Sequence, residues 1–267
     1  MKFSILMAAG IPLVSPLMAA GVKSGHAEAE LLVNTAGYKP GQPLTLGIQL
    51  KVEQGWHSYW VNPGVGGMPL KVTWTLPEGW QAEELRQPIP KRFMTGDLPG
   101  FGYEGTALFL ANVTPPASAQ GEVELKAKVS WLTCNDSACV PGDAELSVKL
   151  PVGEGKPGGD VAAIFQAEKK VPVKMEGAEL IVEEAGDTLT LRVIAPNTFN
   201  LQGSTVFPAT PEVVDPAAPI VFKRAKTEWI ATVKKNEYAE GSPALLDIVL
   251  FGGMLEKPYI VSWQAKK

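Results

Sequence analysis

Cysteine, histidine and charged side chains are scarce in this sequence of 267 residues. There are two cysteines and two histidines, and charged residues make up 19% of the chain. Without a G-x-S-x-G motif, and with so few histidines to act as a base, a serine-type catalytic triad is disfavoured. The cysteine spacing matches no zinc pattern. No acidic residue stands in a setting that marks a glycosidase pair. We therefore do not expect a serine hydrolase, a glycosidase or a zinc-dependent protein.

Clusters of Lys and Arg are also lacking, and the formal net charge is -4. A chain without a basic patch has no means of neutralising nucleic-acid phosphates or an anionic membrane surface. After residue 20 the best apolar run, 243–255, is interrupted by Asp247 and a glycine pair, so it is unsuited to span a membrane. We therefore expect no nucleic-acid partner and no stable membrane insertion.

The first twenty residues resemble a secretory signal peptide. Lys2 gives a basic start, residues 5–18 are mostly apolar, and Ala19 and Ala20 are small residues suited to cleavage. A second candidate cleavage point follows Ala29, so cleavage is expected between residues 20 and 29. The product should be an exported, soluble protein in a compartment where disulfides persist.

Alternation of apolar residues with period two is the main structural signal, and it predicts half-buried β-strands. The segment 106–113 is instead apolar on both faces, as in a central strand. The five predicted strands of this region are 43–50, 70–76, 106–113, 123–131 and 144–150. They predict an all-β sandwich domain over residues 27–152.

A turn-rich segment follows, and we interpret residues 153–172 as a linker. Asp160 is placed to cap a short helix in which Ile164 and Phe165 face the same way, and Pro172 ends it. The linker also contains a formal G-x-G-x-x-G, but no βαβ series surrounds it, so no dinucleotide cofactor is expected. Alternating segments return beyond the linker and predict a second all-β domain over residues 173–267.

The two cysteines, Cys134 and Cys139, enclose the turn-forming residues Asn135, Asp136 and Ser137. A turn there brings the two Cα atoms within the roughly 4.4–6.8 Å that a disulfide requires. A structural staple is the ordinary interpretation of such a pair. However, so short a ring contributes only about 2 kcal/mol of stability by the chain-entropy relation. Asp136 should also oppose thiolate formation, which suits a thiol shuttle better than a strong oxidant. We therefore favour a reactive disulfide.

An aromatic segment, residues 55–60 (GWHSYW), precedes a turn at residues 62–64 (NPG). On a strand, the tryptophans would point into the core while His57 and Tyr59 point the other way. Both of these side chains carry polar groups that favour a boundary or a functional site.

These segments, together with residues 102–105 (GYEG), 131–134 (WLTC) and 139–141 (CVP), resemble the amino-terminal periplasmic domain of the thiol:disulfide interchange protein DsbD and its ScsB-like branch. The resemblance extends over most of residues 28–152. Residues 206–208 (VFP) and the final strands resemble the second β domain of the ScsB-like branch.

The resemblance implies two immunoglobulin-like β-sandwiches joined by a short helical linker, in the periplasm, with Cys134 and Cys139 as the redox pair. The pair would receive electrons from a membrane-embedded thiol reductant and pass them to periplasmic thioredoxin-like proteins. It also implies aromatic residues near the pair and a cap loop at roughly residues 91–102. The residues that match these roles are His57, Tyr59, Phe101 and Tyr103, with Phe93 competing with Phe101.

The family's transmembrane carrier and thioredoxin-like domain have no counterpart in this sequence, so we expect the reductant to be a separate protein. The leading hypothesis is a periplasmic thiol:disulfide exchange module, a component of a protein-disulfide reductase. One alternative is a non-catalytic binding module with a structural disulfide. Another is Cu(I) binding, in which the cysteines, His57 and Met68 or Met94 would be soft ligands; no metal site is otherwise expected.

Overall fold

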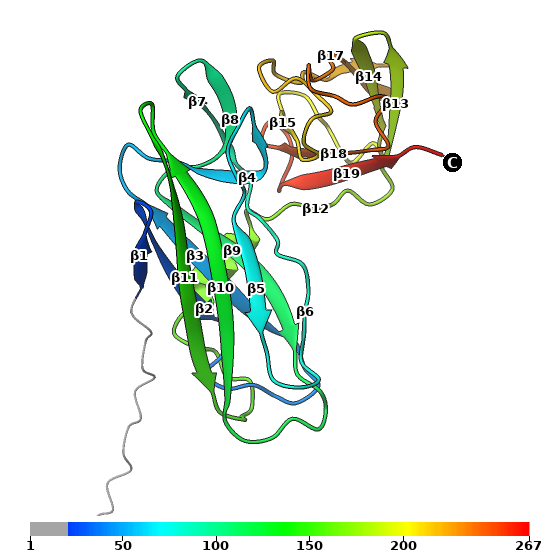
Figure 1. Cartoon of the computed structure of the whole chain (residues 1–267). Coiled ribbons are helices and arrows are strands. Elements are labelled where there is room, and N and C mark those ends of the chain that lie inside the picture. Colours follow the sequence, from blue (N-terminus) through cyan, green and yellow to red (C-terminus); the bar gives the residue numbers. More distant parts are fainter. Residues whose placement is uncertain (1–20, 267) are drawn as a thin grey trace, which may run out of the picture.

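The structure is a computed structural model that describes residues 21–266 and consists almost entirely of β-strands (Figure 1). Within that range the only helix is α1 (Val161–Glu168), and no helix there is long and apolar enough to cross a membrane. The expected signal peptide, residues 1–20, lies outside the described residues. The prediction of an all-β immunoglobulin-like fold is confirmed.

The first sandwich is built from three antiparallel sheets. Its largest sheet has the order β1 (Val22–Ser24), β2 (Ala27–Val33), β3 (Leu44–Val52), β9 (Thr106–Thr114) and β6 (Gln81–Ala82). The second has the order β11 (Cys139–Leu150), β10 (Val123–Cys134) and β5 (Lys71–Thr75), and the third β4 (Ser58–Gly64), β8 (Leu98–Tyr103) and β7 (Lys91–Thr95). The β4–β8–β7 sheet lies at one end of the sandwich (Figure 1).

Alternation along the strands explains the core of this sandwich. On β10, Leu125 and Val129 are fully buried while Lys126 and Lys128 are exposed, as the period-two pattern predicts. Buried side chains of β3 and β9, among them Ile48 and Phe109, belong to the same hydrophobic cluster. The predicted strands are all present, with bounds that differ by a few residues.

Helix α1 covers the outer face of the five-stranded sheet. Ile164 and Ala167 are buried in one cluster with Leu108 and Leu110 of β9, which explains why that strand is apolar on both faces. The prediction that Phe165 shares the face of Ile164 was wrong. Phe165 is 57% exposed, because consecutive helical residues lie about 100° apart around the axis.

Asp160 precedes α1 as predicted, but its side chain makes no capping hydrogen bond. Its carboxylate instead accepts a hydrogen bond from the backbone N–H of Val33 at 3.2 Å. The residue thus joins the segment before α1 to β2, and the expectation that it caps the helix was wrong.

The second sandwich consists of two four-stranded sheets. One has the order β12 (Val173–Lys174), β19 (Tyr259–Gln264), β18 (Leu245–Phe251) and β15 (Thr205–Pro208), and the other β13 (Glu179–Ala185), β14 (Thr188–Ile194), β17 (Glu228–Lys234) and β16 (Lys223–Ala225). A separate hydrophobic cluster fills the space between them. The proposed domain bounds 27–152, 153–172 and 173–267 stay predictions.

The amino-terminal strands distinguish the two candidate cleavage points of the expected signal peptide. β1 pairs with β2, and Ala27 and Ala29 of β2 are buried. Cleavage after Ala20 leaves both strands whole, whereas cleavage after Ala29 would remove β1 and divide β2.

Replacement of Leu125 by Ala tests this core. We expect Leu125→Ala to lower the free energy of unfolding by about 2–5 kcal/mol, because a fully buried side chain leaves a cavity. Lys128→Ala, on the exposed face of the same strand, should change it by about 0.5 kcal/mol or less. Urea unfolding of the two variants measures the difference, and equal effects would contradict the assigned faces.

Candidate functional site

The two cysteines form a disulfide at the end of the longest hairpin of the molecule. β10 and β11 pair without interruption from Val123 opposite Leu150 to Cys134 opposite Cys139. The Cα atoms of the cysteines are 4.1 Å apart, close to the distance of a cross-strand pair that shares no backbone hydrogen bond. This register is what brings the two sulfur atoms together.

The turn between the cysteines is held by Asn135. Its side-chain oxygen accepts hydrogen bonds from the backbone N–H groups of Ser137 and Ala138 at 2.8 and 2.9 Å. Its own N–H donates to the carbonyl oxygen of Ala138 at 2.9 Å. The turn predicted from residues 135–137 is therefore present.

The two cysteines differ sharply in exposure. Cys134 is fully buried, whereas Cys139 is exposed. The backbone of Cys134 is also fixed by His57, because each residue's N–H donates to the other's carbonyl oxygen at 2.9 Å. The disulfide thus joins one open cysteine to one that is enclosed.

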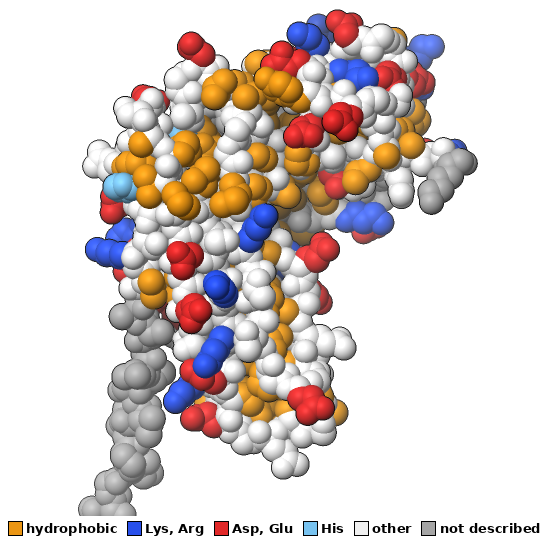
Figure 2. All heavy atoms as spheres, viewed as in Figure 1, with side chains coloured by type: hydrophobic (Ala, Val, Ile, Leu, Met, Phe, Trp, Pro, Cys, Tyr) orange, Lys and Arg blue, Asp and Glu red, His pale blue; other side chains and the backbone are white. Residues whose placement is uncertain are grey.

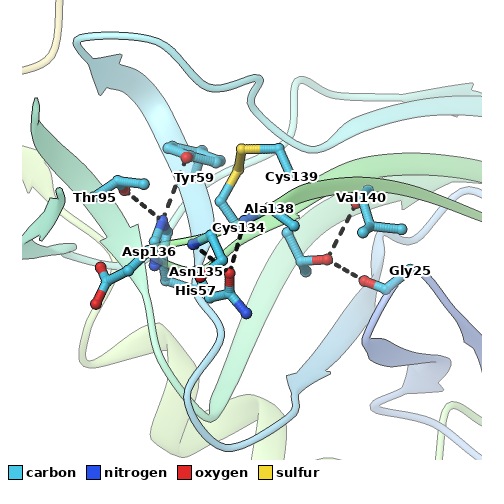
Figure 3. The surroundings of a disulfide bond; sticks show 12 residues. Gly25, His57, Tyr59, Thr95, Cys134, Asn135, Asp136, Ala138, Cys139 and Val140 are labelled. Carbon is cyan, nitrogen blue, oxygen red and sulfur yellow. Dashed lines mark hydrogen bonds between the residues drawn. A yellow bond between two sulfur atoms is a disulfide. The ribbon is translucent and has the colours of Figure 1, made fainter.

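Neutral polar side chains lie beside Cys134 (Figure 3). The His57 Nε2 atom is 3.3 Å from the Tyr59 hydroxyl and 3.0 Å from the Thr95 hydroxyl. Burial lowers the pKa of His57, although the charges of Glu104 and Asp136 act in the opposite direction. Burial also raises the pKa of Tyr59. Both side chains are therefore uncharged near neutral pH.

Two glycines make room for the aromatic rings of this site. A Cβ atom on Gly67, whose φ is +88°, would come within 2.3 Å of the Tyr59 ring. A Cβ atom on Gly100 would come within 2.5 Å of the Phe93 ring. Phe93 in turn lies against His57, with ring centroids 3.8 Å apart.

The residues proposed to surround the disulfide are not all found there. His57 and Tyr59 lie beside it (Figure 3). Phe93 packs against the rings of both, whereas Phe101 lies on the opposite face of the β7–β8 hairpin, against Arg92. Phe101 is paired with Arg92 rather than with Phe93 in the strand register, which places it on the other face. Tyr103 is a core residue whose hydroxyl donates to the carbonyl oxygen of Pro88 at 2.8 Å. Placement near the pair is therefore corrected for Phe101 and Tyr103, and the functional roles of His57 and Tyr59 stay predictions.

The expected cap segment is an antiparallel hairpin formed by β7 and β8. The sequence-based prediction did not include Thr95, near the tip of this hairpin, as a neighbour of His57. Thr95, Gly96 and Asp97 stand between apolar residues, and this turn signal identifies a hairpin tip. The Gly96 N–H also lies 3.5 Å from an oxygen of Asp136, across from the cysteine turn.

A hollow of about 830 Å³ opens beside the cysteine turn. Its walls include His57 and the acidic residues Glu53, Glu104 and Asp136. Within residues 21–266, no three His, Cys, Asp or Glu side chains are grouped so that they would hold a metal ion. The Cu(I) alternative stays a hypothesis.

The fold and the site define an immunoglobulin-like β-sandwich with a disulfide between one open and one enclosed cysteine. Residues 28–151 match the family described as thiol:disulfide interchange protein DsbD, N-terminal. The match covers the first sandwich of the chain, and together with the Cys134–Cys139 disulfide it indicates a thiol–disulfide interchange module.

Among solved structures, the N-terminal periplasmic domain of ScsB from Proteus mirabilis is similar in fold. It has a TM-score of 0.64 at 18% identity, and the match covers 90% of this chain and 93% of that one. The major pilin subunit BcpA of Bacillus cereus aligns with a TM-score of only 0.28 at 11% identity, over 90% of this chain and 68% of that one. No curated protein matches this sequence.

The buried histidine predicts a pH dependence of stability. Because folding lowers the pKa of His57, the unfolded chain binds more protons than the folded one at acidic pH. This contribution destabilises the fold as the pH falls through about 6.5, the ordinary pKa of histidine, and is absent above it. We expect His57→Gln to lose less stability than the wild type between pH 7 and 5 in urea unfolding. An identical loss in both proteins would show that His57 is not responsible.

Proposed function

We propose that the chain is a periplasmic thiol:disulfide exchange module that passes electrons through Cys134 and Cys139 to thioredoxin-like proteins. The observation that carries the proposal is the pairing of an exposed Cys139 with a buried Cys134 at the turn end of a hairpin. The family assignment supports partners of two kinds, a membrane-embedded thiol reductant and periplasmic thioredoxin-like proteins.

The exchange begins with the reduced pair. The Cys139 thiolate attacks one sulfur of the partner's disulfide, forms a mixed disulfide, and releases the partner's other sulfur as a thiolate. The Cys134 thiolate then attacks Cys139, closes the internal disulfide, and releases the partner's second thiolate. Two electrons move to the partner, whose thiolates take up the two protons that the cysteines release. The membrane reductant restores the pair by the reverse sequence.

The difference in exposure supports an order in which the two cysteines react. A sulfur reacts only when the attacking sulfur can reach it along the line of the bond that breaks. Cys139 is open to a partner, whereas Cys134 is enclosed and held by the backbone of His57. Cys139 is therefore the residue that exchanges with partners, and Cys134 is the residue that resolves the mixed disulfide.

The surroundings of the pair also support a protein partner. Hydrophobic side chains gather over the β4–β8–β7 sheet, whereas charged side chains are more frequent on the lower part of the sandwich (Figure 2). The exposed residues of that sheet include Val61, Met94 and Leu98, at 40%, 52% and 49% exposure. Such an apolar surface next to an exposed cysteine is typical of a docking region. We propose that His57 and Tyr59 form the uncharged inner wall of the site.

Single cysteine variants test the assigned order. We expect Cys134→Ser, which keeps the exposed thiol, to react with the aromatic disulfide DTNB about tenfold or more faster than Cys139→Ser, which keeps the buried one. Unfolding both variants in denaturant should make the two rates equal, which controls for intrinsic reactivity. A faster reaction of Cys139→Ser in the folded state would reverse the assignment.

The reduction potential of the pair tests the function itself. Equilibration in graded thiol buffers, followed by trapping of free thiols, should give about -180 to -270 mV, the range of exchange proteins. A value below about -300 mV would mean a structural staple. It would overturn the proposal and favour the binding module.

A further inference from the structure

The second sandwich rests on the small sheet that flanks the disulfide. The ring of Phe207 on β15 has its centroid 5.0 Å from that of Phe101 on β8 and 6.4 Å from that of Trp60 on β4. Asn62, also on β4, donates a hydrogen bond to the carbonyl oxygen of Pro208 at 2.8 Å. Phe207 is buried in the hydrophobic cluster of the first sandwich. The two sandwiches therefore share a packed contact at the β4–β8–β7 sheet.

Arg92 extends this contact to β7, the edge strand of the sheet. Its guanidinium carbon lies 5.0 Å from the ring centroid of Phe101 and 5.9 Å from that of Phe207. The guanidinium also donates hydrogen bonds to the carbonyl oxygens of Pro216 and Ala218 in the second sandwich. One side chain thus links the edge strand to both an aromatic pair and a loop of the other sandwich.

The opposite face of the same strand contacts the site. Side chains alternate along a strand, so Phe93 and Thr95 point away from the face that carries Arg92. The Phe93 ring lies 3.8 Å from that of His57, and the Thr95 hydroxyl is 3.0 Å from His57 Nε2. β7 therefore lies between the second sandwich and the side chains beside the disulfide.

An edge strand of this kind depends on contacts outside its own sheet. β7 has five residues and pairs with β8 alone. A short edge strand is held by a single ladder of backbone hydrogen bonds, and local opening is governed by such weakly held segments. A planar guanidinium that stacks on aromatic rings and donates several hydrogen bonds is well suited to hold the strand, and lysine is no substitute for it.

We infer that the second sandwich braces the β7–β8 hairpin through Arg92, and so sets how firmly Phe93 and Thr95 are held against His57 beside the disulfide. Arg92 is a positioning residue, since it contacts neither cysteine. The inference rests on the proposed exchange at Cys134 and Cys139, and it gives the second sandwich a part in that exchange. Loss of the brace frees the hairpin and increases the access of a reductant to the disulfide.

Arg92→Met, which keeps an apolar stem but removes the guanidinium, tests the brace in the full chain. We expect dithiothreitol to reduce its disulfide about threefold to tenfold faster than that of the wild type, the change that corresponds to the loss of about one hydrogen bond. Amide hydrogens of the β7–β8 ladder should exchange faster by a similar factor, a change that a purely global loss of stability would spread over all strands.

Arg224→Met is the matched control, because that guanidinium lies 5.7 Å from the Trp229 ring centroid, within the second sandwich. It should leave both the reduction rate and the hairpin exchange at wild-type values. Equal rates in Arg92→Met, Arg224→Met and the wild type would overturn the inference.

Two further variants keep the test decisive if Arg92→Met does not fold. Arg92→Lys keeps the charge without the stacking plane, and Phe207→Leu removes the ring from the other side of the contact. Each should accelerate both reduction and hairpin exchange, and the absence of an effect in both would also overturn the inference. The reduction potential tests the proposed exchange function separately from the brace. The rates of reduction and of hairpin hydrogen exchange can be measured without a redox partner, and they test the brace even if the disulfide is only structural.

Discussion

The register of the β10–β11 ladder is the constraint on which the site depends. Twelve consecutive pairs fix Cys134 opposite Cys139, and the same ladder sets which side chains of β10 enter the core. A slip of one residue would separate the cysteines and turn Leu125 and Val129 toward solvent, so burial of the core and formation of the disulfide enforce one another. The bridge between Cys134 and His57 then places the aromatic segment next to the pair.

The neighbouring strands use the same alternation to serve two purposes. On β4, Tyr59 faces the site while Trp60 packs toward Phe207 of the second sandwich. On β7, Phe93 faces the site while Arg92 reaches that same Phe207. Because side chains alternate along a strand, those of adjacent residues point to opposite faces of the sheet. The site and the contact between sandwiches are consequently built on the same strands, back to back.

Much of this was predictable from the sequence, since local patterns carry the needed information. Alternation predicted β3, β5, β10 and β11 of the first sandwich, and Asn135 belongs to a predicted turn that the structure contains. The face of the strand on which an individual side chain lies was harder to predict from the sequence. Phe101 lies in a segment rich in glycine and proline with no alternation to orient it, and a register irregularity between β4 and β8 removes the remaining cue. Arg92 donates its hydrogen bonds to residues more than 120 positions away, which no local pattern encodes.

The disulfide lies where it contributes little to the stability of the fold. A cross-link stabilises a fold chiefly by restricting the unfolded chain, and a ring of this length restricts it little. The folded hairpin also restrains the turn without the bond, because the ladder reaches Cys134 and Asn135 closes the turn with three hydrogen bonds. The bond therefore adds little to a geometry that the strands already define. Its opening would release two sulfurs into a site whose shape the surrounding sheets maintain, which is what repeated oxidation and reduction requires of a scaffold.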